Sequence, residues 1–190
     1  MDSPAIIEVL SRTVPAAGLE SVASGDGMPT IYVAREQLVP TCLALRDARD
    51  LRFALLADLL PVDYHPREPR YEVVYLLASL GVGGFGDTPK RLRMKVRVPG
   101  GDDSTLPSIS SVWPAANWSE REAYDLFGLH FEGHPDLRRI LMPDDWDGHP
   151  LRKDYPVQIK MPVKVYEPLQ VSQEQFVASI EATRERARQD

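Results

Sequence analysis

The chain has 190 residues, 43% of them hydrophobic and 26% charged, and its net charge at pH 7 is −6. These values are typical of a globular protein and allow one domain with an appendage. The acidic balance argues against a nucleic-acid binder, because phosphate recognition needs a basic face. No run approaches the roughly 20 apolar residues that span a bilayer, and the acidic start MDSPAIIEVL does not resemble a signal peptide. We therefore expect a cytosolic protein.

Cysteine usage supports the same expectation. The one cysteine, Cys42, lies in the apolar run TCLAL, where we expect a buried structural thiol. A single thiol excludes an internal disulfide, which fits a reducing compartment, and it cannot hold a four-thiolate iron–sulfur cluster within this chain.

Hydrophobic periodicity predicts two helices and four strands in the first half of the chain. Ser3 and Pro4 are typical of a helix start, with the serine as N-cap and the proline at the first helical position. A second helix is expected over residues 35–50, where apolar side chains recur at helical spacing. The strands are expected at residues 30–34, 52–64, 70–80 and 90–98.

The last of these strands, KRLRMKVRV, alternates between an apolar and a basic face. The apolar face consists of Leu92, Met94, Val96 and Val98. The basic face consists of Arg91, Arg93, Lys95 and Arg97. We interpret the basic side chains as a solvated sheet face, with a docking surface as the alternative.

The predicted order is helix, strand, helix and then three strands. The helix between the first two strands favours a parallel pair, whereas the short connections that follow suit an antiparallel meander. A mixed four-stranded sheet with helices packed on one face closes such a chain, so we predict the α+β class.

The stretch GVGGFG, residues 81–86, matches the G-x-G-x-x-G pattern of a dinucleotide-binding turn. Such a turn must open a helix, because the pyrophosphate binds the amides at the helix N-terminus. Here Asp87, Thr88 and Pro89 lead directly into the alternating strand. We therefore interpret the glycines as a hairpin turn and expect no cofactor site there.

A further helix is predicted in the stretch NWSEREAYDLFG. Ser119 and Glu122 have the spacing of a capping box, and Gly128 stands where a glycine closes a helix. Glu120 falls in the predicted first turn, where the helix dipole favours negative charge. We take residues 1–128 as an α+β core domain that includes this helix.

The charged side chains of this helix suggest two kinds of role. Arg121 and Asp125 have the i,i+4 spacing of an ion pair. Catalysis by paired carboxylates, chosen from Glu120, Glu122 and Asp125, is disfavoured because neighbours on one short helix do not flank a substrate bond.

Three histidines allow a metal site to be considered. His130, His134 and His149, with Asp136, are possible zinc ligands. A glycine and a proline interrupt their spacing, and no helix presents the first two to one ion. We therefore favour histidines in turns or at an interface.

Residues 129–190 form the second predicted part, an irregular interaction arm. Prolines recur at positions 135, 143, 150, 156, 162 and 168, which excludes long helices and central strands. The anchors Trp146, Leu151 and Tyr155 predict that the arm becomes ordered by wrapping over its own domain and a partner. A terminal helix is expected after the capping box of Ser172 and Gln175; its apolar side is Phe176, Val177 and Ile180.

Two blocks with fixed spacing, NWSEREAYDLFGLHFEGHPDLRRIL and DGHPLRKDYP, dominate residues 107–156. They resemble the family of the C subunit of NADH-quinone oxidoreductase, the thirty-kilodalton subunit of respiratory complex I. Upstream, ADLLPVDY is similar to a strand of that family that ends in an aspartate–aromatic pair. The resemblance assigns to a family motif and interface the residues Glu120, Arg121, Glu122, Asp125, His134, Arg138, Asp147, His149, Pro150, Leu151, Arg152, Lys153, Asp154, Tyr155 and Pro156.

The resemblance implies a peripheral subunit without chemistry of its own. A member of this family carries no flavin, cluster or nicotinamide, and it packs against the D subunit, near the B and I subunits. The whole complex carries FMN and iron–sulfur clusters, oxidises NADH, reduces quinone and translocates protons. The chain would then hold no catalytic, cofactor or metal site, and it would reach the cytoplasmic side of the bacterial inner membrane only through the complex. Equivalent subunits of membrane-bound hydrogenases or formate hydrogenlyases, and a stand-alone adaptor, are the alternatives.

Overall fold

The computed structural model describes residues 2–81, 89–156 and 172–186, the side chains of 182–186 excepted. The chain forms two compact units, Met1–Tyr155 and Pro156–Asp190. By this division residues 129–155, which the proline pattern groups with the arm, belong to the first unit. A functional boundary after residue 128 stays a prediction.

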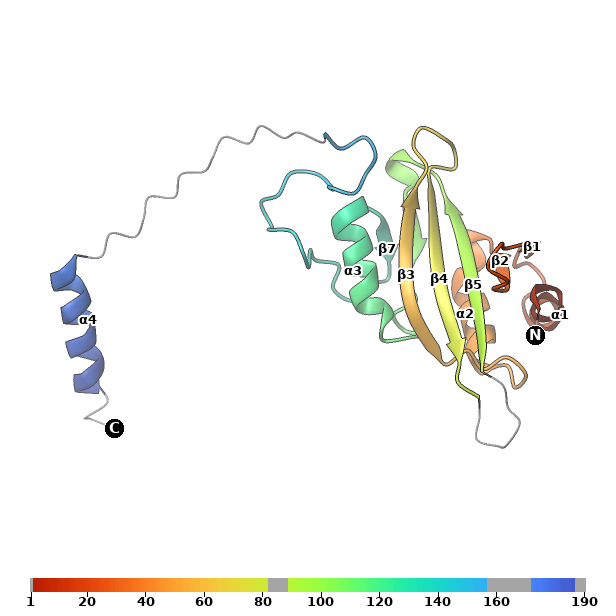
Figure 1. Ribbon diagram of the computed structural model, residues 1–190, viewed down its shortest axis with the longest axis horizontal. Coiled ribbons are helices and arrows are strands. Elements are labelled where there is room, and N and C mark those ends of the chain that lie inside the picture. Colours follow the sequence, from red (N-terminus) through yellow and green to blue (C-terminus); the bar gives the residue numbers. More distant parts are fainter. Residues whose placement is uncertain (1, 82–88, 157–171, 187–190) are drawn as a thin grey trace. The chain divides into compact units, whose positions relative to one another are not determined.

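The main sheet of the first unit is mixed and has five strands instead of the predicted four (Figure 1). In order across the sheet they are β1 (Glu20–Val22), β2 (Thr30–Tyr32), β5 (Lys90–Val98), β4 (Tyr71–Ser79) and β3 (Leu55–Asp63). The additional strand, β1, is antiparallel to β2 and has three residues. So short a strand shows no alternation, which explains why hydrophobic periodicity does not predict it.

The first two predicted strands correspond to β2 and β3. They are not neighbours in the sheet, so the predicted pairing between them is wrong. β2 pairs in parallel with β5, and β3 forms the opposite edge of the sheet. β3 still runs in the direction of β2, because the two antiparallel pairings of β4 lie between them. The connection from β2 to β3 therefore crosses the sheet, and β5 and β4 lie between these two strands.

The β4–β5 pairing confirms that a strand follows the glycine-rich stretch. The ladder runs from Tyr71 opposite Val98 to Ser79 opposite Lys90. Gly81, the first glycine, has a φ of 80°, whereas residues 82–86 of the stretch lie outside the described residues. The next element in the described residues is therefore the strand β5, whereas a dinucleotide turn requires a helix there.

Three helices of the first unit, α1 (Ser3–Thr13), α2 (Leu38–Asp47) and α3 (Ala116–Phe127), contribute to one hydrophobic core with the sheet. A short 3₁₀ turn, Arg35–Gln37, precedes α2. In Figure 1, β4 and β5 pass in front of α2, and α3 lies beside β3.

The start of α1 differs from the prediction by one residue. Asp2 is the N-cap, and its carboxylate accepts a hydrogen bond from the Ala5 amide at 3.2 Å. Ser3 is buried instead, and its hydroxyl accepts a hydrogen bond from the Thr30 amide at 2.9 Å. The serine thus ties α1 to β2, a contact between residues distant in the sequence that a local pattern does not reveal.

The core confirms the alternation predicted for β5. The four apolar side chains of its inner face are fully buried: Leu92, Met94, Val96 and Val98. Cys42 of α2 is also fully buried, as predicted, and burial raises the pKa of its thiol. The Trp113 indole donates a hydrogen bond to the Phe53 carbonyl at 3.1 Å, which satisfies its polar atom inside the core.

The structure also contains a second, two-stranded sheet that hydrophobic periodicity does not predict. β6 (Thr105–Pro107) follows a 3₁₀ turn, Gly101–Asp103, and pairs in parallel with β7 (His130–Glu132). Leu106 and Phe131, at the centres of these strands, are buried in the core. α3 lies between the two strands in the sequence, so this small sheet holds the chain on both sides of α3.

α3 begins earlier than predicted and ends where predicted. It starts after Ala115, so Ser119 and Glu122 lie inside the helix and the predicted capping box is wrong. Gly128 closes the helix with a φ of 75°. A Cβ at this glycine would lie 2.6 Å from Cδ2 of His149, so both the backbone and the histidine ring require glycine there.

The second unit contains α4 (Gln173–Arg186), and its predicted capping box is confirmed. The Ser172 hydroxyl accepts a hydrogen bond from the Gln175 amide at 3.2 Å, and the Gln175 side chain accepts one from the Ser172 amide at 3.1 Å. Phe176, Val177 and Ile180 are exposed on this helix. Within the described ranges, no helix of either unit is long and apolar enough to cross a membrane.

We expect Gly128→Ala to destabilise the first unit by more than the roughly 1–2 kcal/mol that a left-handed conformation costs a residue with a Cβ. The excess arises because the added methyl group overlaps the His149 ring. Gly133→Ala is the matched control, since Gly133 has a φ of 79° and a Cβ added there would have no atom within 4 Å. Urea unfolding measures both variants, and equal losses would contradict the role of His149.

Candidate functional site

The candidate site is the motif loop, residues 133–156, together with α3 and the ends of β3 and β4 that the loop contacts. The loop contains no regular helix or strand, as the prolines predict. It nevertheless follows a defined path, because polar side chains on α3 and between β3 and β4 bind its backbone. Most of the residues that the sequence resemblance assigns to the family motif make these contacts.

Asp125 of α3 is the centre of the first contact. Its side chain is fully buried, and one carboxylate oxygen accepts hydrogen bonds from the amides of Ile140, Leu141 and Met142 at 3.0, 2.8 and 2.8 Å. The other oxygen accepts one from Arg139 at 2.8 Å. Burial alone would raise the pKa of Asp125, but these donors outweigh it and lower the pKa to about 2. The carboxylate is therefore ionised and folds the loop around itself.

Two arginines extend this contact along the loop. Arg121 donates hydrogen bonds to the carbonyls of Arg138 and Arg139 at 3.0 and 2.9 Å. Arg139 also donates to the carbonyls of Trp146 and Gly148 at 3.1 and 3.0 Å. The predicted ion pair between Arg121 and Asp125 is therefore wrong, because the carboxylate faces inward to Arg139 while Arg121 reaches the loop backbone.

His149 and Tyr155 hold the second half of the loop. The His149 ring packs on Gly128, and its Nδ1 lies 2.9 Å from the Asp125 carbonyl. The Tyr155 hydroxyl donates a hydrogen bond to the Asp147 carbonyl at 3.1 Å, which closes the loop on itself. Both groups contact loop or helix backbone within this chain.

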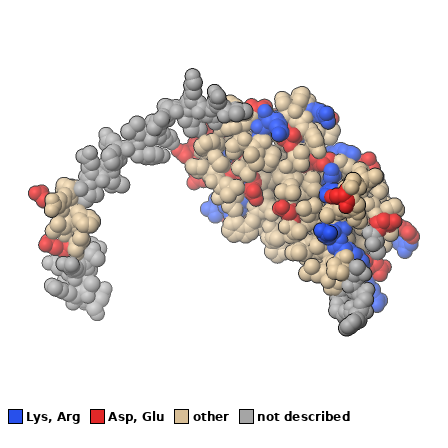
Figure 2. Space-filling model, viewed as in Figure 1, with Lys and Arg blue, Asp and Glu red and all other residues tan. Residues whose placement is uncertain are grey.

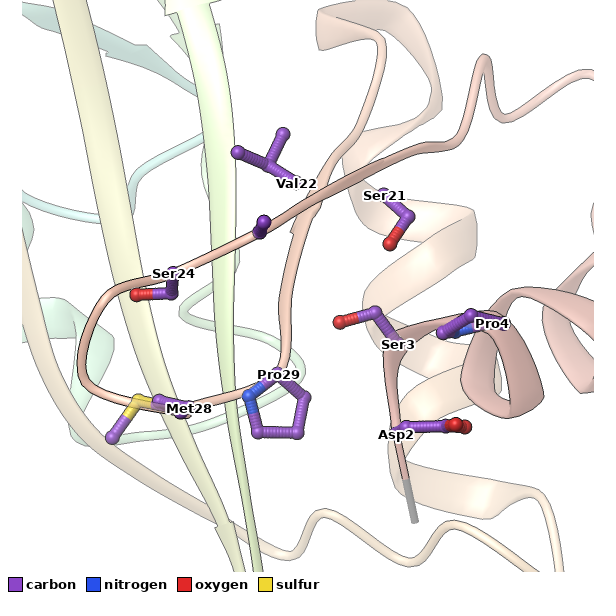
Figure 3. Close-up of a pocket in the computed structure, with 10 residues that line it drawn as sticks. Asp2, Ser3, Pro4, Ser21, Val22, Ser24, Met28 and Pro29 are labelled. Atoms are coloured by element: carbon purple, nitrogen blue, oxygen red, sulfur yellow. The ribbon is translucent and has the colours of Figure 1, made fainter.

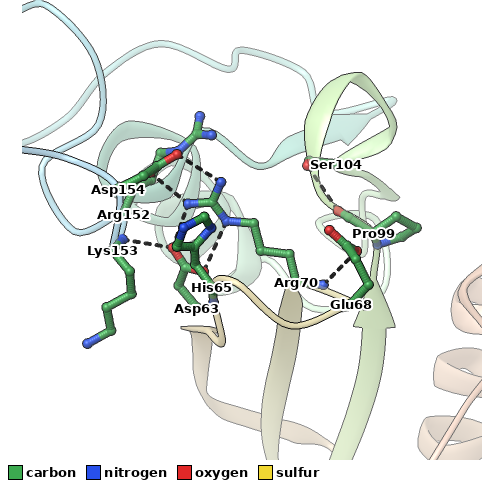
Figure 4. Close-up of polar contacts among 9 residues, drawn as sticks. All are labelled: Asp63, His65, Glu68, Arg70, Pro99, Ser104, Arg152, Lys153 and Asp154. Carbon is green, nitrogen blue, oxygen red and sulfur yellow. Dashed lines mark hydrogen bonds and ion pairs between the residues drawn. The ribbon is translucent and has the colours of Figure 1, made fainter.

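Asp63, Arg70 and Asp154 form the last contact, at the end of the sheet (Figure 4). Arg70 binds Asp63 through Nε and Nη2 at 3.0 and 2.8 Å, and it binds Asp154 through Nη1 and Nη2 at 3.0 and 2.7 Å. The Lys153 amide donates to the second oxygen of Asp63 at 2.8 Å. The Arg70 guanidinium lowers the pKa of Asp154, and both carboxylates share its charge.

Glu120 is the one buried acid of α3 without a cationic partner at hydrogen-bonding distance. Its oxygens accept hydrogen bonds from the Ser108 hydroxyl at 2.6 Å and the Ile109 amide at 2.7 Å. His134 lies 3.9 Å away; its Nδ1 accepts from the Asp136 amide, so Nε2 carries the proton toward the Asn117 carbonyl. Burial raises the pKa of Glu120 to about 7. α3 starts at Ala116, so Glu120 lies beyond the first turn and the predicted first-turn position is wrong.

A few motif side chains face solvent instead. Glu122 is exposed, and within the part of the chain that the structure describes its carboxylate accepts no hydrogen bond. Leu151 is 51% exposed beside Lys153, and Leu141 is 61% exposed where the loop turns over Asp125. These side chains form an exposed surface on α3 and on the motif loop, whose backbone is held by the contacts described above.

The structure does not bring the three histidines of the predicted alternative to one ion. Across residues 2–81, 89–156 and 172–186, no three histidine, cysteine, aspartate or glutamate side chains lie close enough together to hold a metal ion. His134 and His149 each contact backbone of α3, and Glu120 and Asp125 are buried rather than paired across a cleft.

A separate open pocket of about 600 Å³ lies at the start of α1 (Figure 3). It is lined by backbone and small side chains, including Ser3, Ser21 and Pro29, with the Met28 side chain at its edge. It shares no lining residue with the motif loop, so the two features are independent.

Two residues that shape the site were not predicted from the sequence. Arg70 and Ser108 bind motif residues, but each lies far from its partner in the sequence. The one signal in the sequence was at Asp63, which ends the strand ADLLPVDY that the resemblance had singled out.

Asp125→Asn should destabilise the first unit by about 2–3 kcal/mol, because hydrogen bonds to a charged group are worth about 1.5–3 kcal/mol. The amide keeps one oxygen for the three loop amides but turns a donor toward Arg139. Glu122→Gln, on the exposed side of the same helix, should change the free energy of unfolding by less than about 0.5 kcal/mol. Urea unfolding at neutral pH compares them; similar values would contradict the role given to Asp125.

Glu120→Gln should remove a pH-dependent part of the stability. Because folding raises the pKa of Glu120 from 4.5 to about 7, its contribution is complete below pH 4.5 and is lost as the pH rises to 7. The free energy of unfolding of the native chain should fall across this window, on the order of 3 kcal/mol, and the variant should lack this fall. Urea unfolding at several pH values measures the slopes; parallel slopes would refute the assignment.

Comparison with known proteins connects this site to one family. The family model described as Respiratory-chain NADH dehydrogenase, 30 Kd subunit, matches residues 31–160, which include α3 and the motif loop. The C subunit of NADH-quinone oxidoreductase from Roseiflexus sp. (strain RS-1) is 45% identical over 157 residues, 83% of this chain and 86% of that protein. The same subunit of Geobacter sulfurreducens is 49% identical over 144 residues, 75% of this chain and 83% of that protein.

A solved structure agrees with these sequence matches. The trypsin-resistant fragment (1–134) of Nqo5 has a TM-score of 0.53 to this chain at 34% identity, covering 70% of this chain and 99% of that one. The fold, the motif and the extent of the matches lead to one assignment: the chain belongs to the family of the 30-kDa subunit of respiratory-chain NADH dehydrogenase.

Proposed function

We propose that this chain is a non-catalytic peripheral-arm subunit of a proton-translocating NADH:quinone oxidoreductase. Family membership supports the complex-level activity. The observation that carries the non-catalytic role is that the buried motif side chains, Glu120 and Asp125, are occupied by contacts within the chain. In this proposal FMN and the iron–sulfur clusters, and the sites for NADH and quinone, belong to other subunits.

The motif has two functions in this proposal. Its buried members fix the local backbone: Asp125 binds amides of the motif loop, and Glu120 binds Ser108 and Ile109 ahead of α3. Its exposed members, Glu122, Leu151 and Lys153, contact other subunits from that fixed backbone. A preformed loop favours binding, since less conformational freedom is lost when the partner arrives.

The partners that we propose are the D subunit of the complex first, and its B and I subunits nearby. The chain would be peripheral, on the cytoplasmic side of the bacterial inner membrane, and held there only through the complex. Residues 129–190 would act together as the interaction arm, with the loop as its ordered beginning and the exposed side of α4 as a further contact.

The main test is purification of the tagged full-length chain from native membranes in mild detergent. We expect the other subunits of the complex and NADH:quinone reductase activity in the eluate. Recovery with hydrogenase or formate hydrogenlyase subunits, or in a complex without a redox enzyme, would contradict the proposal.

Glu122→Gln supplies the residue-level prediction. It should lower the yield of assembled complex while the turnover of each assembled complex and the stability of the free chain stay unchanged, because the exposed carboxylate contacts a partner. Glu132→Gln is the control and should assemble normally, because Glu132 is an exposed glutamate on β7 that the resemblance does not assign to the interface. Full assembly of the Glu122 variant with lost turnover would restore a catalytic role.

A further inference from the structure

The main sheet has a second face that none of the helices of the first unit covers. The register across β3, β4 and β5 places on this outer face Leu55, Leu60 and Val62 of β3 and Val74, Leu76 and Ala78 of β4. We call these six side chains the outer strip. Figure 1 looks onto this face, with α2 behind the strands.

The outer strip is not part of the core. None of its side chains joins the core cluster, although Val74 is only 9% exposed. Leu55 and Leu60 are 41% and 44% exposed. An antiparallel sheet with one face in water normally carries polar residues on that face, so an apolar strip indicates that something covers it.

Charged side chains lie beside and within the outer strip. Beside it β5 carries Arg91, Arg93, Lys95 and Arg97, and within it the exposed Asp58 of β3 stands between Leu55 and Leu60, opposite Leu76. Figure 2 shows Lys and Arg gathered over β5 and a mostly uncharged surface over β3 and β4.

Three of the four basic side chains already have partners within the chain. Arg93 pairs with Asp26 at 2.6 Å, Lys95 with Glu72 at 2.8 Å, and Arg97 with Glu20 at 3.0 Å. Arg91 is exposed opposite Ala78, and among the described residues it forms no ion pair. A ligand on the strip therefore meets one unneutralised cation at the hairpin end of β5.

We propose that the outer strip binds an amphipathic helix of another subunit, with an acidic side chain toward Arg91. The strip from Leu55 to Val62 is about 23 Å long at ~3.3 Å per residue, the length of a helix of about 15 residues. Both edges of the sheet are unsuited to adding a strand, because β1 has three residues and α3 packs beside β3. The inference rests on the proposed function, since the helix belongs to the same complex.

Site-specific crosslinking in the purified complex tests the proposal. Benzoylphenylalanine at position 60 should crosslink to a helical segment of another subunit that carries acidic residues. The matched control is position 43 on α2, where Leu43 is 39% exposed on the opposite layer. We expect at least about tenfold less crosslinking there, as for a site outside an interface core.

The outcomes separate this inference from the proposed function. The proposed role of the outer strip is overturned if position 60 crosslinks only to a second copy or within the chain. It is also overturned if position 60 forms no crosslink in an assembled complex. In both cases the proposed function stands. Absence of the chain from any NADH:quinone oxidoreductase overturns the proposed function itself.

Charge and apolar variants give an independent measurement on the full chain. Leu60→Glu should reduce recovery of assembled complex by about tenfold or more, equivalent to about 1.4 kcal/mol or more, and Arg91→Glu should reduce crosslinking from position 60. Leu43→Glu should assemble normally, and all three isolated chains should keep the melting temperature of the native chain. Normal assembly of the Leu60 variant would refute the proposal.

Discussion

The path of the motif loop depends on the buried carboxylate of Asp125. A charge without solvent is stable only where donors surround it, and here three consecutive backbone amides and Arg139 supply them. Consecutive amides that converge on one oxygen force the chain to curve around it, as in an anion-binding turn. The loop therefore obtains from one side chain the backbone order that a helix or strand would obtain from its own hydrogen bonds.

The residues of the family motif therefore have two roles: some stabilise the backbone of the chain, and others are exposed to partners. Asp125, a buried member of the motif, accepts hydrogen bonds from three loop amides, so its loss lowers the stability of the chain. Exposed members, of which Glu122 is the clearest, leave stability unchanged and are available to partners. A motif that is dense in acids and histidines can thus look catalytic in sequence while its chemistry consists of fixing a surface.

The sequence predicted what depends on neighbours in the chain and missed what depends on distant partners. The alternation of β5, the closing glycine at 128 and the capping box at Ser172 are local signals, and all three are confirmed. Ser3 resembled an N-cap, but its hydroxyl accepts a hydrogen bond from β2. Ser119 also resembled an N-cap, but it lies inside α3, which is longer than predicted. At the site, the resemblance identified the motif residues, but helical spacing assigned Asp125 to the wrong arginine because Arg139 approaches from the loop.

The contacts of Arg121 have a consequence for proteolysis. The loop contains two adjacent arginines, and trypsin would cut the bonds whose carbonyls belong to Arg138 and Arg139. Both carbonyls accept hydrogen bonds from Arg121, so neither bond can enter a protease in extended form until that contact opens. Cleavage there would then report the frequency of local opening rather than the exposure of the side chains, even though Arg138 extends into solvent.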